Sequence, residues 1–244
     1  MKSIEEITEH TLVIKKSEFI CTLIPLNDEE KINETIDYYK NNLKTNFIDL
    51  RDTFNLNKDE YLYYGTDHHW TTRGANLAYL EYCREVGIKC NNYSFSVVND
   101  KFYGTLYSKV LDNSLQYDYI EKVIDNTKYS IYFDDEDRYS NSLYNYDYLD
   151  KKDKYSFFLD NNHSLITIEN LDSEKDNSIL IIKDSYANAF VPLIAPEYKY
   201  IYVIDPRYYN VSISDYINDN DIENVLFIYN VLTIDDDFGI ASIK

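Results

Sequence analysis

The stretch 66–75, Thr-Asp-His-His-Trp-Thr-Thr-Arg-Gly-Ala, holds residue types that suit chemistry. It contains two of the four histidines of the chain and its only tryptophan. Asp67 precedes His69 by two positions, so on a tight turn its carboxylate can lie beside the imidazole and fix its tautomer, as the acid does in a Ser-His-Asp triad. The spacing therefore predicts the acid and base of a hydrolase-like or acyl-transfer site, whose nucleophile must come from elsewhere.

We interpret Ser185 as that nucleophile. It follows an apolar run at Ser178–Lys183, and a short helix is expected directly after it. A serine that opens a helix can instead be only an N-cap, although a preceding strand favours a nucleophile. In the catalytic interpretation, Ser185 attacks an acyl carbonyl, while His69 takes its proton and later returns it. Trp70 is expected to pack beneath the motif.

An adjacent Asp-His-His group also suits a metal ion. A zinc site needs a further ligand, and His163 is the remaining histidine apart from His10. A metal-dependent hydrolase at Asp67, His68, His69 and His163 is therefore an alternative. In the main interpretation there is no cofactor or metal, and His68 projects differently from His69 because neighbouring side chains of an extended segment point apart.

Composition limits the partners of the chain. Its 244 residues carry 24 Lys and Arg against 43 Asp and Glu, a formal charge of -19, which would repel nucleic acid. No stretch approaches the roughly 20 apolar residues of a membrane span, and residues 1–10 are charged rather than signal-like. The three cysteines show no zinc spacing. We expect neither nucleic-acid binding nor direct membrane insertion.

The N-terminal part alternates strands and helices, which favours a parallel sheet. The motif is expected to precede a helix that has cap residues at Thr71 and Thr72 and ends at Gly87. The expected strands are Thr11–Lys15, Phe19–Leu26 and Phe47–Leu50, with Glu60–Tyr64 as an extended segment, and the expected helices are Glu29–Asn41 and Arg73–Val86.

The region from about 102 to 175 is rich in Tyr, Asp and Asn and shows no helical period. We expect an inserted antiparallel β region there, entered through a glycine-bearing loop at Phe102–Lys109. Its tyrosines could cover a carbohydrate or merely reflect strand propensity. The expected strands are Tyr117–Val123, Tyr129–Phe133, Ser156–Leu159 and Ser164–Ile168.

The last third consists of short apolar runs separated by helices, as in buried parallel strands. In open α/β sheets ligands gather at the carboxyl ends of the strands, and Ser185, Arg207 and Asn230 each lie just past such an end. The expected strands are Ser178–Lys183, Tyr198–Ile204 and Val225–Tyr229, and the expected helices are Tyr186–Ala195 and Ser212–Asn218.

The tetrahedral intermediate of acyl transfer needs donors aimed at its oxyanion. The backbone N–H of Ser185 is one candidate. Arg207 either takes this role or pairs with a carboxylate such as Asp205. The further oxyanion or substrate candidates are Asn230, Tyr186, Asn188 and Asn162.

Three blocks of the sequence resemble the DHHW protein family of Gram-positive bacteria. They are 64–71 (Tyr-Gly-Thr-Asp-His-His-Trp-Thr), 183–192 (Lys-Asp-Ser-Tyr-Ala-Asn-Ala-Phe-Val-Pro) and 205–209 (Asp-Pro-Arg-Tyr-Tyr). The resemblance runs from about residue 20 to residue 230. That family is similar in turn to the SGNH hydrolase-like domains of alginate O-acetyltransferases, in which a D-x-H-W block precedes a G-D-S block.

The resemblance implies a single α/β domain over 1–244 with the β-rich insertion at about 102–175. Its fold would be a three-layer, flavodoxin-like SGNH fold with a parallel central sheet and a permuted motif order. Asp67 and His69 match the acid and the base, Ser185 matches the nucleophile, and Asn230 corresponds in strand order to the SGNH asparagine. Lys183 stands where the G-D-S motif has Gly, which puts the tightness of the nucleophile turn in question.

From the resemblance we expect a serine esterase or O-acetyltransferase that acts on acetyl esters of a cell-envelope carbohydrate. Its partners would be the acetylated carbohydrate or acetyl donor and an envelope acetyl-transfer protein. The resemblance implies an extracytoplasmic location. No export signal is visible in the sequence, so a cytoplasmic location is the alternative. Sequence leaves esterase and transferase undecided. The alternative is a non-catalytic carbohydrate-binding or scaffolding protein on the same fold.

Overall fold

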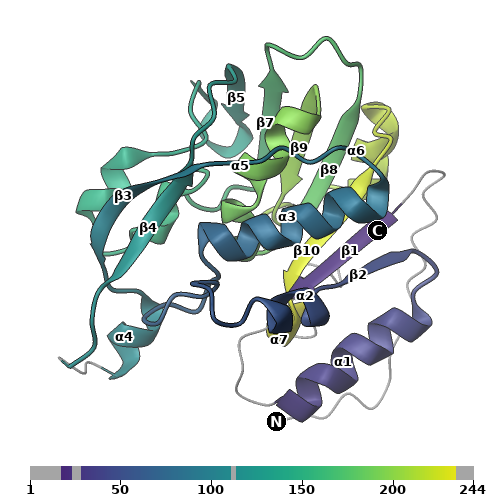
Figure 1. The fold of residues 1–244 in the computed structure, drawn as a ribbon. Helices are drawn as coiled ribbons and strands as arrows, with labels where there is room; N and C mark the ends of the chain where they lie inside the picture. The colour runs from purple at the N-terminus through teal and green to yellow at the C-terminus, as the bar shows by residue number, and fades with distance from the viewer. Residues whose placement is uncertain (1–17, 24–28, 111–113, 235–244) are drawn as a thin grey trace.

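A mixed eight-stranded sheet forms the centre of the protein (Figure 1). The structure is a computed structural model that describes residues 18–23, 29–110 and 114–234. The strand order is β2-β1-β10-β8-β9-β7-β5-β6. The first five of these strands are parallel, namely β2 (Asn46–Asp49), β1 (Glu18–Leu23), β10 (Val225–Asn230), β8 (Ser178–Lys183) and β9 (Tyr200–Ile204).

The predicted parallel pairing is therefore correct for these five strands, and the antiparallel strands predicted at 129–133 and 164–168 are also present but join the same sheet. Beyond β9, the strands β7 (Leu165–Asn170), β5 (Tyr129–Phe133) and β6 (Arg138–Ser140) pair antiparallel. Ile166 and Ile168 of β7 are fully buried in the same core as β9, so these strands extend the sheet edge instead of forming another layer. A separate two-stranded sheet contains β3 (Phe95–Phe102) and β4 (Asp118–Val123).

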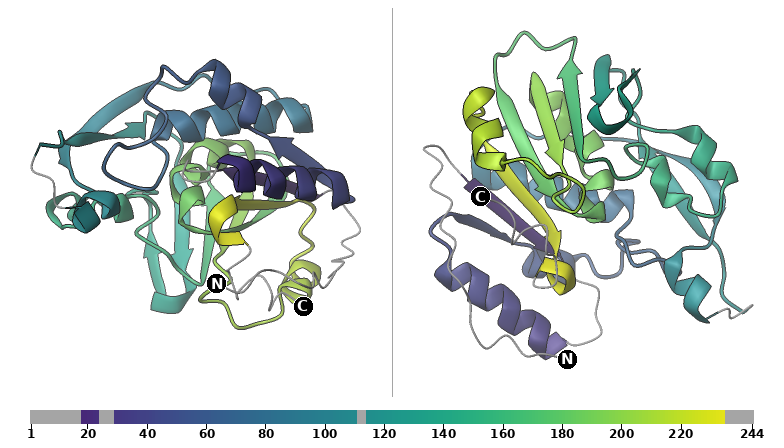
Figure 2. Two further views of the ribbon diagram at one scale, coloured as in Figure 1. Left: turned by 90° about the horizontal axis from the view of Figure 1, so that it is seen from below. Right: turned by 180° about the vertical axis from the view of Figure 1, so that it is seen from behind.

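Helices cover both faces of the sheet because the side chains of its strands are apolar on both sides (Figure 2). On one face, Ile179 and Ile181 of β8 belong to a core that includes α3 (Thr72–Val86) and α5 (Val191–Ile194). On the other face, Leu180 and Ile182 pack in a core with α6 (Ile213–Asp219). The buried residues of α1 (Glu29–Asn42) lie in a cluster with Val231 of α7 (Val231–Ile234).

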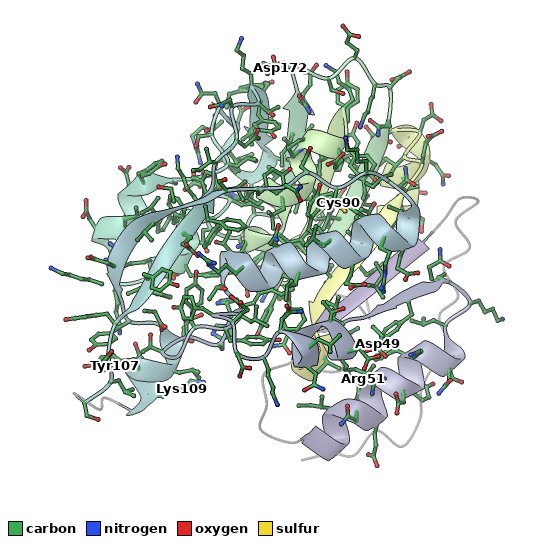
Figure 3. All side chains as sticks on the ribbon, viewed as in Figure 1. Asp49, Arg51, Cys90, Tyr107, Lys109 and Asp172 are labelled. Atoms are coloured by element: carbon green, nitrogen blue, oxygen red, sulfur yellow. The ribbon has the colours of Figure 1, made fainter. Side chains whose placement is uncertain are left out.

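The helix that follows the histidine motif has both predicted caps. The Thr71 side chain accepts a hydrogen bond from the Gly74 N–H, and Gly87 ends the helix in the left-handed conformation, with φ of 72°. The short helix α2 (Arg51–Leu56) was not predicted. At its start, the side chain of Arg51 forms an ion pair with that of Asp49, and Arg51 Nη2 lies 2.7 Å from Asp49 Oδ2. Figure 3 labels both residues.

Three local predictions are wrong or incomplete. The predicted loop 102–109 contains the helix α4 (Thr105–Val110). The predicted strand 156–159 is instead the 3-10 helix η3 (Tyr155–Phe157), followed by three residues with positive φ at 159–161. The predicted helix 186–195 is divided into η4 (Ser185–Ala189), α5 and η5 (Ala195–Glu197), with a proline near the start of the last two, where its missing N–H is tolerated.

Two further expectations concern the first predicted strands and membrane-spanning helices. The predicted strand 11–15 and the last residues of the predicted strand 19–26 lie outside the described residues. None of the helices that the structure describes is long and apolar enough to cross a membrane.

Candidate active site

The histidine motif forms a tight turn that a buried carboxylate holds in place. Asp118 of β4 accepts hydrogen bonds from the backbone N–H of Gly65 at 2.9 Å and of Thr66 at 2.7 Å. The hydroxyl of Tyr61 donates to the same carboxylate at 2.7 Å. An isolated bridge between Tyr63 and Trp70 closes the turn just before α3. The acid and base therefore lie on a turn that is fixed from both sides.

Asp67 lies beside His69, as the spacing suggested. Its Oδ1 is 2.6 Å from His69 Nδ1 and also accepts from the backbone N–H of His69 at 3.0 Å. Its Oδ2 accepts from the backbone N–H of Thr105 at 2.8 Å and from the Thr105 hydroxyl at 3.1 Å. Burial alone would raise the pKa of Asp67, but the hydrogen bonds and charge of its partners hold that pKa well below its usual range. Asp67 is therefore ionised, and both of its carboxylate oxygens accept hydrogen bonds.

Ser185 lies at the carboxyl end of β8, in the first turn of η4. The N-cap is the preceding residue, Asp184, whose carboxylate accepts from the Tyr186 N–H at 2.9 Å and from the Asn230 N–H at 2.8 Å. The capping role that competed for the serine thus belongs to its neighbour. The Ser185 hydroxyl lies 2.7 Å from His69 Nε2.

The three side chains therefore form one continuous line of hydrogen bonds. Because ionised Asp67 can only accept, His69 Nδ1 carries the proton, and Nε2 is free to accept from the Ser185 hydroxyl. His69 and Ser185 are 116 positions apart in the sequence. This arrangement can remove a proton from the serine hydroxyl and return it to a leaving group.

Aromatic residues contact both the His69 imidazole and the turn that carries Ser185, and so fix their relative positions. The ring of Tyr155 stacks on that of His69, with centroids 3.6 Å apart and planes 4° apart, and its hydroxyl donates to the Ser185 carbonyl at 3.1 Å. Trp70 is fully buried and donates from Nε1 to the Tyr186 carbonyl at 2.8 Å. Trp70 therefore packs beneath the motif, as expected, and joins it to the serine turn.

Three of the oxyanion or substrate candidates, Asn230, Tyr186 and Asn188, have different surroundings. Asn230 lies at the end of β10, beside the nucleophile turn, through its backbone bond to Asp184. The buried Tyr186 donates its hydroxyl to the His68 carbonyl. The Asn188 amide donates to the 161–162 segment, at 3.3 Å to the Asn161 carbonyl and 3.2 Å to Asn162 Oδ1.

Arg207 forms the carboxylate pair that was its alternative interpretation. Its Nε and Nη2 donate to Asp205, with Nη2 2.5 Å from Asp205 Oδ2. The fully buried Asp205 also faces Lys183 Nζ at 3.3 Å, and Lys183 donates to Asn162 Oδ1 at 2.8 Å. Burial lowers the pKa of Lys183, while Asp205 acts in the opposite direction. The lysine that replaces the motif glycine thus points into a buried charge network.

The metal alternative finds three of its four residues together. One ligand atom each from Asp67, His68 and His69 lie within 4.8 Å of one another. His163 instead places Nδ1 2.8 Å from Asp135 and Nε2 2.9 Å from the Asp160 carbonyl. Two of the three grouped side chains already bond each other, and His69 Nε2 faces Ser185. The donor set therefore fits a proton-transfer site better than a cation site.

Sequence reasoning missed three residues that complete this arrangement. Thr105 supplies two of the hydrogen bonds of Asp67, and Tyr155 covers His69. Gly104 lies so close that an added Cβ would be 2.2 Å from Asp67 Cβ. A glycine directly before a threonine, in a chain with five glycines, was the only signal that could have drawn attention to this segment.

Comparison with known proteins identifies the family and the fold. Residues 27–204 match the family described as DHHW protein. A DHHW family protein from Eubacterium siraeum has a similar structure, with a TM-score of 0.82 and 24% identity over 95% of this chain and 84% of that one. No curated protein matches the sequence.

Two further solved structures share the fold. PatB1 from Bacillus cereus, solved alone and with a sulfonyl adduct, has a TM-score of 0.71 and 21% identity over 89% of this chain and 83% of that one. The O-acetyltransferase domain of Pseudomonas putida AlgJ has a TM-score of 0.50 and 11% identity, covering 89% and 76% of the two chains. At these identities the likeness concerns the fold.

Proposed function

The chain belongs to the DHHW family, and from that premise and the geometry of the site we propose that it is a serine-dependent O-acetyltransferase or acetyl esterase. The proposal rests on one observation, the unbroken hydrogen-bonded line from Asp67 through His69 to the Ser185 hydroxyl. Ser185 is the nucleophile, His69 the general base and acid, and Asp67 the group that fixes the tautomer of His69.

In the first half-reaction, Ser185 Oγ attacks the carbonyl carbon of an acetyl ester. The serine proton passes to His69 Nε2, and the developing imidazolium is stabilised by Asp67. Collapse of the tetrahedral intermediate expels the alcohol, which takes the proton back from His69. In the second half-reaction, water or a sugar hydroxyl gives its proton to His69 and attacks the acetyl carbon, and the bond to Ser185 Oγ breaks as His69 returns the proton to the serine. Hydrolysis and transfer therefore share the same acetyl-enzyme.

The oxyanion donors are assigned from their surroundings. The backbone N–H of Ser185 at the start of η4 and the side chain of Asn230 at the neighbouring strand end are the first choices. Tyr186 and Asn188 support the site through their bonds to the His68 and Asn161 carbonyls. Arg207 is held by Asp205 and is the candidate for contact with the substrate.

We place the substrate in the class of acetylated cell-envelope carbohydrates, with an acetyl-donating partner protein and an extracytoplasmic location. The supports are family membership and a fold shared with a domain whose structure is described as an O-acetyltransferase. We likewise propose one SGNH-type, flavodoxin-like domain with its β-rich insertion at about 102–175. Helices on both faces of a partly parallel sheet agree with that fold class.

The test is to treat the protein with an aromatic sulfonyl fluoride and with p-nitrophenyl acetate. We expect the sulfonyl group on Ser185 by peptide mass spectrometry, and acetyl release that falls to background in Ser185→Ala. Ser108→Ala is the matched control, because that hydroxyl donates to the Gly104 carbonyl at 3.3 Å and takes no part in the line from Asp67 through His69 to Ser185. Turnover that survives in Ser185→Ala would reject Ser185 as the nucleophile, and a wild-type protein that neither releases acetate above background nor takes up the sulfonyl group would favour the non-catalytic carbohydrate-binding protein.

A further inference from the structure

We propose that His68 binds the acyl acceptor, by accepting a hydrogen bond at Nε2 from a second hydroxyl next to the one that is acetylated. The inference rests on the proposed function. The His68 side chain is 38% exposed, against 6% for His69 and 2% for Asp67. Its ring lies against that of His69, with centroids 3.8 Å apart. His68 is thus the solvent-facing imidazole of the site.

Contacts on two sides fix the orientation of His68. Its Nδ1 lies 2.6 Å from Thr105 Oγ1, and its backbone carbonyl accepts a hydrogen bond from the buried hydroxyl of Tyr186. Thr105 in turn is anchored to Asp67 through both its N–H and its hydroxyl. A ring that is held at Nδ1 leaves Nε2 as its remaining polar atom.

The protons of this chain can be assigned from donor and acceptor capacity. The Thr105 hydroxyl has one proton and faces both the Asp67 carboxylate at 3.1 Å and His68 Nδ1 at 2.6 Å. If it donated to His68, an oxygen lone pair would face an ionised carboxylate, which is repulsive. The hydroxyl therefore donates to Asp67, and His68 Nδ1–H donates to Thr105. The lone pair of His68 Nε2 is then available to a ligand.

The charge state supports this assignment. Burial and the neighbouring His69 lower the pKa of His68 to about 4; Lys109 acts in the same direction, and Asp67 and Asp153 oppose it. Lys109 lies on α4, the same helix as Thr105 (Figure 3). Near pH 7 the ring is therefore neutral, and Nε2 accepts rather than donates.

The acceptor step can now be written in full. The attacking hydroxyl oxygen forms a bond to the acetyl carbon, its proton moves to His69 Nε2, and the bond from that carbon to Ser185 Oγ breaks as His69 returns the proton to the serine. His68 exchanges no proton in this step. It holds a second hydroxyl of the same molecule, and so favours vicinal diols such as sugars over monoalcohols.

The experiment measures acetyl transfer from p-nitrophenyl acetate to ethylene glycol and to ethanol, mixed at equal concentration. The ratio of the two acetate esters is taken within one sample, so the folded fraction does not affect it. Because one neutral hydrogen bond contributes about 1 kcal/mol, we expect the wild-type diol preference, after correction for the two hydroxyls, to fall roughly 5-fold in His68→Leu. Thr105→Val should lower the ratio as well, whereas Thr105→Ser should keep it and His163→Gln should leave both ratio and rate unchanged.

The outcomes separate this inference from the proposed function. If acetyl-Ser185 forms but the ratio is the same in wild type and His68→Leu, the assignment of His68 is wrong and the proposed function stands. Equal losses of both esters in His68→Leu would likewise overturn it, since they would show a structural role. If no acetyl-Ser185 forms in the wild type, the proposed function itself fails.

Discussion

Two regions of the molecule hold an aspartate bonded to a histidine, and only one of them faces a nucleophile. Asp67 lies 2.6 Å from His69, and Asp135 lies 2.8 Å from His163. The far nitrogen of His69 faces the Ser185 hydroxyl, whereas that of His163 faces the Asp160 carbonyl, which can only accept. An acid–imidazole pair is therefore not sufficient by itself, and the group on the other side of the imidazole decides whether the pair can move a proton.

The surroundings of the two acids differ as well. Asp67 is 2% exposed and receives four hydrogen bonds, while the side chain of Asp135 is 36% exposed. A buried, fully bonded carboxylate stays ionised and holds its partner in one orientation without rearrangement, which is the preorganisation that catalysis requires. The partly exposed Asp135 carboxylate is less firmly held, although its partner His163 is buried.

The sharpest test of this difference replaces each acid by its amide. Asp67→Asn should lower turnover of p-nitrophenyl acetate by roughly 10,000-fold, because the amide donates to His69 and imposes the wrong tautomer. Asp135→Asn is the matched control and should change turnover by less than about twofold, since surface substitutions of this kind are nearly neutral. Steady-state kinetics measures both. Equal losses in the two variants would show that the Asp67 pair has no special role.

A second test concerns Gly104, which lies directly against Asp67. Gly104→Ala places a methyl group 2.2 Å from Asp67 Cβ, so the acid must move. A displacement of about 1 Å predicts a roughly 100-fold loss of turnover. Gly65→Ala is the matched control, because its Cβ would be 3.7 Å from Asp118 Oδ1, an ordinary contact. Circular dichroism and the rate of sulfonyl labelling of Ser185 separate a displaced site from an unfolded protein.

If Gly104→Ala keeps wild-type turnover while remaining folded, the contact between 104 and Asp67 has no part in positioning the acid. If Gly65→Ala loses as much as Gly104→Ala, the whole turn tolerates no change, and the specific role of Gly104 is rejected.

The sequence predicted the site best where its geometry is set by neighbours in the chain. The Asp67 and His69 pairing follows from a spacing of two, and β8 and β10 were expected within one residue of their observed bounds because buried parallel strands are continuous apolar runs. The placement of Ser185 and Asn230 together at the carboxyl edge of the sheet was expected from the topology of α/β sheets.

What the sequence did not predict depends on distant packing. Thr105 meets Asp67 across 38 positions, and Tyr155 meets Ser185 across 30, with no periodic pattern to connect them. The antiparallel strands of the insertion were expected, but their attachment to the central sheet was missed for the same reason, since the pairing of β7 with β9 depends on which edge is open and not on the composition of either strand. The residues that hold the site were therefore less predictable than those that act in it.

The smallest expected effect concerns His68, whose side chain is more exposed to solvent than either of the two imidazoles just compared. Its pKa is about 4 in the folded protein, below the ordinary 6.5, so the unfolded chain binds more protons between these values. The free energy of unfolding should therefore fall as pH drops from about 7 to about 4, and the loss should be about 1 kcal/mol because the exposed third of the ring is screened by solvent. His68→Gln removes this titration, so its stability should decline less steeply. Urea unfolding at pH 7 and pH 4.5 compares the two slopes, and parallel slopes would show that His68 is not desolvated against its neighbours.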